Sequence, residues 1–280
     1  MFEILKRKQL NPSVVRIDVA APLVAHKAQP GQFIILRTDE RGERIPLTIA
    51  DFDREAGTVA VIFQIVGATT EKLAHLQVGD ALADFVGPLG RATETDGLHK
   101  VAVVGGGVGC AIAYPVAKKL HEQGTEVHTI VGFRNKELVI LEDEFAAVSD
   151  RLVLMTDDGS YGEKGLVTNA LKELIDSGEQ YDEVIAIGPL VMMKFVSLLT
   201  KEYGIKTVVS MNPIMIDGTG MCGGCRLTVG GETKFACVDG PEFDGHLVDF
   251  DEAMQRGKMY AGFERRAHDE TCRLFKKEVR

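Results

Sequence analysis

The most informative stretch for the fold class is Val101-Ala-Val-Val-Gly-Gly-Gly-Val-Gly-Cys-Ala-Ile-Ala-Tyr-Pro115. A continuous apolar run ends in a glycine-rich turn, and the turn leads into a helical pattern over residues 111–122. Glycines in such a turn let backbone N–H groups approach an anion at the positive end of a helix. Strand, glycine turn and helix in this order predict the first unit of a doubly wound parallel sheet.

Strands and helices keep alternating after this unit. Apolar runs predict strands over 126–132, 152–156, 183–187 and 207–210, and helical periodicity covers 166–177 and 191–203. This pattern predicts an α/β nucleotide-binding domain over residues 99–210 with a doubly wound parallel sheet. The motif G-x-G-x-x-G is only partly met, because Cys110 or Ile112 stands at its third glycine. A tight strand-to-helix turn without a ligand is therefore the alternative interpretation.

Three further residues follow predicted strands of this domain at the sheet edge where ligands bind. Gly188 follows the fourth strand, Arg134 the second and Asp157 the third. The arginine suits a 2′-phosphate and the carboxylate suits ribose hydroxyls, as do those of Glu137 and Asp158. The sequence thus predicts a dinucleotide but leaves NAD(H) and NADP(H) open.

Residues 1–98 have a different pattern. Short apolar runs at 14–19, 33–37 and 59–65 are separated by turn residues, which predicts a small antiparallel β-barrel. One short helix is expected at 70–76, with Thr69 or Thr70 as its N-cap. The run Arg44-Ile-Pro-Leu-Thr48 is placed between two barrel strands, and Gly67-Ala-Thr-Thr70 precedes the short helix.

The C-terminal quarter carries a cysteine pattern. Asp217, Cys222, Cys225 and Cys237 follow the spacing D-x₄-C-x₂-C-x₁₁-C. A plant-type [2Fe-2S] site has C-x₄-C-x₂-C with a more distant fourth Cys, so Asp217 stands at the position of the first ligand. A zinc site with Asp217 or His246 as fourth ligand, and reduced thiols without a metal, are the alternatives. Residues 211–250 are expected to form this small subdomain, with a hairpin around Gly230, and residues 251–280 a helical tail.

Composition excludes several classes of function. The chain has 280 residues and a formal net charge of −9, without a basic stripe for nucleic acid. Its apolar stretches are too short for a membrane span, and the first ten residues lack the apolar core of a signal peptide. A soluble, cytoplasmic protein is expected. Three of its five cysteines lie within sixteen residues, which in such a compartment favours metal binding over disulfides.

The barrel motif, the G-x-x-[ST] turn and the glycine loop together resemble the ferredoxin-NADP⁺ reductase superfamily. The resemblance implies FAD on the barrel, with nicotinamide brought to the flavin ring by the second domain. It implies contacts to the flavin from Arg44, Pro46, Leu47 and Thr48, to its phosphates from Gly67, Thr69 and Thr70, and to the nicotinamide dinucleotide from Gly106, Gly107 and Gly109. Pro46 and Leu47 stand where many members have an aromatic residue.

The runs 211–225 and 235–246 narrow the resemblance. They are similar to electron-transfer subunits of dihydroorotate dehydrogenase and, more closely, to small subunits of the NADH-dependent ferredoxin-NADP⁺ oxidoreductase (sulfide dehydrogenase-like) family. Asp217 favours the second group, because the first has Cys at that position. This resemblance implies electron transfer between NAD(H), FAD and a [2Fe-2S] cluster. It also implies a heterodimer with a larger flavo-iron–sulfur subunit, through which ferredoxin is an indirect partner. Dihydroorotate- or sulfide-linked electron transfer and a redox-sensing flavoprotein are the alternatives.

Overall fold

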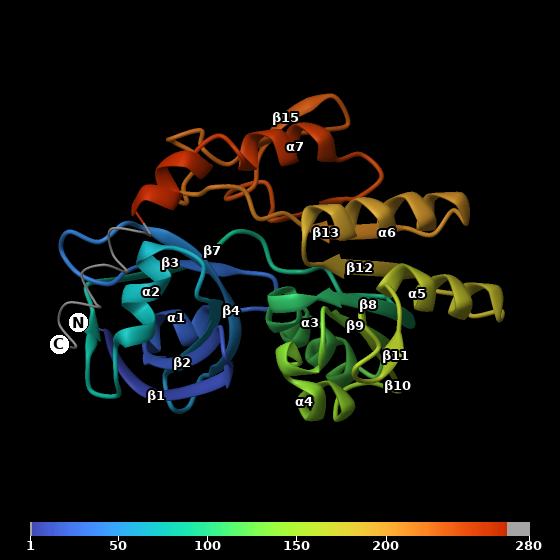
Figure 1. Cartoon of the computed structure of the whole chain (residues 1–280), viewed down its shortest axis with the longest axis horizontal. Helices are drawn as coiled ribbons and strands as arrows, with labels where there is room; N and C mark the ends of the chain where they lie inside the picture. Colours follow the sequence, from blue (N-terminus) through green and yellow to red (C-terminus); the bar gives the residue numbers. More distant parts are fainter. Residues whose placement is uncertain (1, 268–280) are drawn as a thin grey trace.

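The computed structural model describes residues 2–267. Figure 1 shows an antiparallel barrel beside a parallel-sheet domain, with the C-terminal segment lying along both. The barrel sheet has the strand order β6-β1-β2-β5-β4-β3-β7, and its consecutive partners are antiparallel. Its strands are β1 (Phe2–Asn11), β2 (Val14–Ala20), β3 (Phe33–Arg37), β4 (Ile45–Asp53), β5 (Thr58–Gln64), β6 (Ala81–Leu82) and β7 (Asp84–Leu89), and its helices are α1 (Pro22–Lys27) and α2 (Ala68–His75).

Strand β4 corrects the expectation that the run from Arg44 to Thr48 lies between strands. Its first half, Ile45–Thr48, pairs with β3, whereas its pairing with β5 begins only at Ile49. Pro46 is tolerated here because the missing N–H faces the unpaired side and removes no ladder hydrogen bond. One side of this half-strand is therefore left open.

Helix α2 also differs from the expectation. It begins at Ala68 and has Gly67 as its N-cap, so an N-cap at Thr69 or Thr70 was wrong. The side chain of Thr70 acts at this end in another way. Its Oγ1 accepts from the N–H of Gly67 and of Val66, at 3.0 Å each. A side chain in the first turn thus satisfies donors that precede the helix.

The second domain is the predicted doubly wound sheet, with strand order β11-β10-β9-β8-β12-β13-β16. Its strands are β8 (Lys100–Gly106), β9 (Glu126–Phe133), β10 (Arg151–Thr156), β11 (Glu163–Lys164), β12 (Glu183–Ile187), β13 (Thr207–Ser210) and β16 (Glu242–Asp244). The helical segments are η1 (Gly107–Gly109), α3 (Cys110–Glu122), η2 (Lys136–Leu138), α4 (Glu142–Ala146), α5 (Val167–Asp176) and α6 (Leu190–Glu202). The chain order reverses between β8 and β12, and that reversal creates a crevice at the carboxyl ends of the strands.

The C-terminal segment is tied to this sheet. Strand β16 pairs antiparallel with β13 at the sheet edge, and no sequence pattern indicated it. The hairpin expected around Gly230 is confirmed as β14 (Arg226–Val229) and β15 (Glu232–Phe235). Helix α7 (Phe250–Gly257) begins one residue before the expected helical tail and runs into it, whereas residues 268–280 of that tail are outside the described residues. Among the described helices, none has the length and apolar character needed to cross a membrane.

Candidate functional site

A cavity of about 1470 Å³ opens between the barrel and the parallel sheet. This volume exceeds the roughly 300–1,000 Å³ of pockets for one drug-sized ligand. Ten of the residues singled out from the sequence line it: Pro46, Leu47, Thr48, Thr70, Gly106, Gly107, Gly109, Arg134, Asp157 and Gly188. The barrel motif and the glycine loop, which are far apart in the sequence, thus meet at one cavity.

Three of the residues predicted to bind FAD or the dinucleotide do not line the cavity. Thr69 donates its hydroxyl to Glu43 Oε2 at 3.0 Å, and Gly67 caps α2. The guanidinium of Arg44 donates from Nε to the carbonyl oxygen of Ile216 at 3.0 Å. Arg44 therefore joins the start of β4 to the residue directly before Asp217, a connection that no sequence pattern predicted.

The glycine loop has the shape that an anion site requires. Gly107 has φ +55°, and a Cβ there would meet no atom within 4 Å, so its backbone faces open space. A Cβ at Gly109 would lie 2.5 Å from the carbonyl oxygen of Ile187. Only glycine thus allows the start of α3 to approach the end of β12, and the N-terminus of α3 opens on the cavity. Cys110, at the third position of the partial motif, is fully buried, and burial raises the pKa of its thiol.

Arg134 and Asp157 both line the cavity, directly after the ends of β9 and β10. The N–H of Asp157 donates to the carbonyl of Phe133 at 3.0 Å, which fixes the ends of β9 and β10 together. The neighbouring Asp158 is turned to its own loop, since its Oδ1 accepts from the N–H of Ser160 at 2.9 Å. Of the two aspartates, only Asp157 lines the cavity.

The four predicted metal ligands lie in one loop region. Cys225 and Cys237 are buried, and their Sγ atoms are 3.2 Å apart. This is longer than the S–S bond of about 2.05 Å, so the two are free thiols. Burial, and next the hydrogen bond with Cys225, raises the pKa of Cys237 to about 12. Two thiols whose sulfurs lie this close fit a site where a bound cation takes the place of their protons.

Cys222 and Asp217 belong to the same segment, but among the described residues no three of the four predicted ligand atoms lie within 4.8 Å of one another. The thiol of Cys222 is exposed, and its Sγ accepts from the N–H of Gly224 at 3.4 Å. The carboxylate of Asp217 accepts from the N–H of Thr219 at 2.9 Å and of Cys222 at 2.8 Å. The Thr219 bond is the main reason that the pKa of Asp217 is lowered. Asp217 therefore shapes the loop, and its negative charge lies close enough to help raise the pKa of Cys237.

The structure weakens one alternative ligand. The ring of His246 contacts Thr200 Oγ1 on α6, with 3.1 Å between Nε2 and the hydroxyl oxygen. It is thus engaged with another element and not with the cysteine loop. The donors that the loop offers are three sulfurs and one carboxylate, a set that suits a [2Fe-2S] cluster or zinc.

Several lining residues were not anticipated. They come from four separate elements or loops: Phe33, Met192, Met211, Asn212, Met215 and Pro241. Four of them belong to the runs 211–225 and 235–246, but no local pattern assigns any of the six to the cavity, because only the tertiary fold brings them there.

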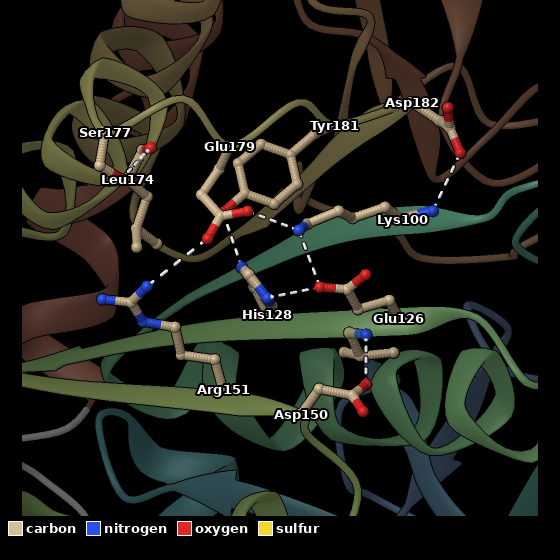
Figure 2. Close-up of polar contacts among 11 residues, drawn as sticks. Lys100, Glu126, His128, Asp150, Arg151, Leu174, Ser177, Glu179, Tyr181 and Asp182 are labelled. Carbon is tan, nitrogen blue, oxygen red and sulfur yellow. Dashed lines mark hydrogen bonds and ion pairs between the residues drawn. The ribbon is translucent and has the colours of Figure 1, made fainter.

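A second polar cluster lies at the opposite ends of the strands (Figure 2). The side chains of Glu126, His128 and Glu179 come close enough to hold a metal ion. The ammonium group of Lys100 already contacts both carboxylates, at 2.7 Å from Glu126 and 2.5 Å from Glu179. It supplies the positive charge that a cation would bring, so this cluster is a structural ion-pair network.

Two parts of the chain match known families. Residues 103–198 match the oxidoreductase NAD-binding domain, and these residues include the glycine loop. Residues 212–249 match the iron-sulfur cluster binding domain of dihydroorotate dehydrogenase B, and these include all four predicted ligands.

Three proteins resemble the chain over most of its length. The dihydroorotate dehydrogenase B (NAD(+)) electron transfer subunit homolog of Thermotoga maritima is 47% identical over 258 residues, 92% of this chain and 91% of that protein. The corresponding electron transfer subunit of Streptococcus pneumoniae is 34% identical over 250 residues, 86% of this chain and 95% of that protein. A solved structure of NADH-dependent reduced ferredoxin-NADP oxidoreductase, described for flavin-based electron bifurcation, has a TM-score of 0.91 and 45% identity, covering 96% of this chain and 97% of that chain.

Proposed function

Because this chain belongs to the family of dihydroorotate dehydrogenase B electron-transfer subunits and their homologues, we propose that it passes electrons between NAD(H), FAD and a [2Fe-2S] cluster. The electrons go to or come from a larger partner subunit. It would be the oxidoreductase subunit that binds NAD(H) in a heterodimer.

One observation supports this proposal most strongly. The barrel motif, the glycine loop and the segment that leads into the cysteine loop converge on a single cavity: Pro46 and Gly107 line it together with Met215, two residues before Asp217. Arg44 bonds the carbonyl of Ile216. A dinucleotide, a flavin and a cluster held by these three segments would be close neighbours, as electron transfer requires.

The FAD would lie against the open side of β4. Bound FAD supplies the exchange between hydride transfer and single-electron transfer. Pro46, Leu47 and Thr48 would present the unpaired half of the strand to the isoalloxazine ring. Thr70 lines the cavity at the start of α2, where a phosphate is favoured, and Gly67 and Thr69 shape that turn. Arg44 would neutralise the pyrophosphate.

The nicotinamide dinucleotide would lie across the crevice between β8 and β12. The N-terminus of α3, with Gly106, Gly107 and Gly109, would receive its phosphates, and Gly188 would leave room for the ring. Asp157 would accept from ribose hydroxyls, so we favour NADH over NADPH. The names of the two similar electron transfer subunits, which include NAD(+), support this choice. Arg134 would then lie over the adenosine end.

Cys222, Cys225, Cys237 and Asp217 would hold the cluster. The carboxylate is a harder ligand than a thiolate and would favour ferric iron, which shifts the reduction potential. The partner would be a larger flavo-iron–sulfur subunit that exchanges electrons with ferredoxin, in the cytoplasm. The similar solved structure named for such a reaction supports this reading over dihydroorotate- or sulfide-linked transfer.

The test is anaerobic stopped-flow reduction of the purified protein by NADH and by NADPH. We expect the flavin absorbance to decrease within the time of one catalytic turnover, and to decrease faster with NADH than with NADPH. A flavin that neither nucleotide reduces would rule out electron transfer from the dinucleotide and favour a redox-sensing protein. Mass spectrometry of the subunit that co-purifies at equal stoichiometry would identify the partner.

A further inference from the structure

Arginine side chains contact the backbone next to each of the four predicted cluster ligands. Each guanidinium donates to the carbonyl oxygen of a residue directly before or after a ligand: Arg44 to Ile216 beside Asp217 at 3.0 Å, Arg226 to Gly223 beside Cys222 at 3.1 Å, Arg256 to Gly224 beside Cys225 at 3.4 Å, and Arg91 to Val238 beside Cys237 at 3.3 Å. Three of these contacts join residues at least 32 positions apart in the chain. A pattern that recurs at every ligand, from separate parts of the fold, indicates a role at the ligands themselves.

The peptide between Gly223 and Gly224 shows what such a contact does to the loop. Its carbonyl oxygen accepts from Arg226, and its N–H donates to Cys222 Sγ at 3.4 Å. The C=O and N–H of a planar trans peptide point in opposite directions, so an arginine that holds the carbonyl turns the N–H toward the sulfur. Hydrogen bonds to the sulfurs are among the features that set the reduction potential of an iron–sulfur cluster.

The same side chains bring positive charge to the loop, in a chain whose formal net charge is −9. Among the residues that the structure describes, no carboxylate oxygen lies within 4.0 Å of the guanidinium nitrogens of Arg91, Arg226 or Arg256. Arg44 lies 3.9 Å from Asp84 Oδ2. Reduction of a cluster adds a negative charge, and nearby cations stabilise that charge by Coulomb attraction.

We propose that these four arginines are positioning residues of the cluster site, which fix the loop backbone beside each ligand and raise the reduction potential of the cluster. Both effects act in the same direction, because N–H groups turned toward sulfur and positive charge each favour the reduced form. The inference rests on the proposed function in one respect, that the loop holds a [2Fe-2S] cluster. It does not depend on which partner subunit the chain serves.

Redox titration monitored by EPR, on the purified full chain with its cofactors bound, tests the role of charge through Arg256. We expect Arg256→Gln to move the midpoint potential of the cluster to a more negative value and Arg256→Lys, which keeps the charge, to stay near the native value. In about 1 M salt, where the Debye length is about 3 Å, the shift in Arg256→Gln should shrink. A purely structural defect would give a shift that salt does not reduce.

A second variant tests the backbone contact. Arg226→Met removes both the charge and the donor to Gly223, so the potential should again move to a more negative value. The loop should also hold its cluster less firmly. We expect EDTA to remove iron from this variant several-fold faster than from the native protein, measured by the loss of visible absorbance.

The matched control is Arg54→Gln. Arg54 directly follows β4, at the strand end opposite to the one joined to the cysteine loop, and donates to the carbonyls of His26 and Ala28 at 3.4 and 2.9 Å. This variant loses the same charge and the same kind of bond, and it should keep the native potential. Native potentials in both Arg256→Gln and Arg226→Met, or an equal shift in Arg54→Gln, would overturn the arginine proposal alone. Zinc in place of a cluster in the native protein would contradict the proposed function and this inference together.

Discussion

At the scale of single residues, Arg44 links two parts of the candidate site. It contacts the carbonyl of Ile216 and lies 3.9 Å from Asp84 Oδ2. We expect Arg44→Ala to lower the FAD content of the purified protein, because the pyrophosphate loses its cation and the cysteine loop loses its tie to β4. Flavin released by heat and measured by absorbance checks this. Arg41→Ala, exposed in the preceding turn, is the control, and stoichiometric FAD in Arg44→Ala would contradict the assignment.

Asp217 poses a second question at this scale, because its carboxylate both shapes the loop and stands at a ligand position. Asp217→Ala should lose most of the cluster iron, whereas Asp217→Cys should keep it with a changed EPR spectrum and a shifted potential. Iron analysis and EPR-monitored redox titration measure both effects. An unchanged potential and iron content in Asp217→Ala would show that Asp217 only supports the loop.

At the scale of elements, the joint between β8 and α3 requires the backbone at Gly109 to approach the end of β12 closely. Gly109→Ala would bring a methyl group against Ile187 and Gly188, and overpacking of this kind costs about 1–3 kcal/mol. We expect a lower unfolding temperature together with weaker NADH binding. Gly257→Ala, where a Cβ meets nothing within 4 Å, is the control. Native NADH affinity in Gly109→Ala would argue against a dinucleotide at this joint.

At the opposite end of the sheet, His128 leads us to expect that the stability of the fold depends on pH. His128 is buried among Tyr181, Glu126 and Lys100 (Figure 2), and burial, then the charge of Lys100, lowers its pKa. The unfolded chain therefore binds the proton first, so this residue makes stability fall as pH decreases below about 6.5.

His128→Gln should lessen that fall while costing about 1–2 kcal/mol near neutral pH through lost hydrogen bonds. Thermal unfolding across the acid range measures both effects. His26→Gln, an exposed residue on α1, should keep the native profile. A native-like acid profile in His128→Gln would show that other groups control it.

Elements with strong local patterns were predictable, and those that depend on distant partners were not. The apolar strands β8 and β12 and the glycine turn carry their own signals. Strand β1, with Lys6-Arg-Lys8, has a largely exposed face and reads as polar sequence. Strand β16 exists because it pairs with β13. In the same way, the glycine and cysteine motifs predicted part of the candidate site. Phe33 and Pro241 could not be predicted, because only the tertiary fold brings their segments together around the cavity.

At the scale of the whole molecule, the barrel, the parallel sheet and the C-terminal segment lie together (Figure 1), and residues of all three line one cavity. The barrel and the parallel sheet form two walls of this cavity, and the C-terminal segment forms a third wall. That segment is bonded to the sheet through β16 and to the barrel through Arg44. Such an arrangement suits a chain that changes the form in which electrons travel, from hydride to single electrons, before they reach a partner.

The most direct test of this account is the absorption and EPR spectrum of the purified protein before and after anaerobic addition of NADH, with iron and flavin quantified. We expect one FAD and a [2Fe-2S] cluster in each chain, with the flavin bleached and a reduced-cluster EPR signal appearing on addition of NADH. A colourless protein that contains zinc in the cysteine loop would contradict the account.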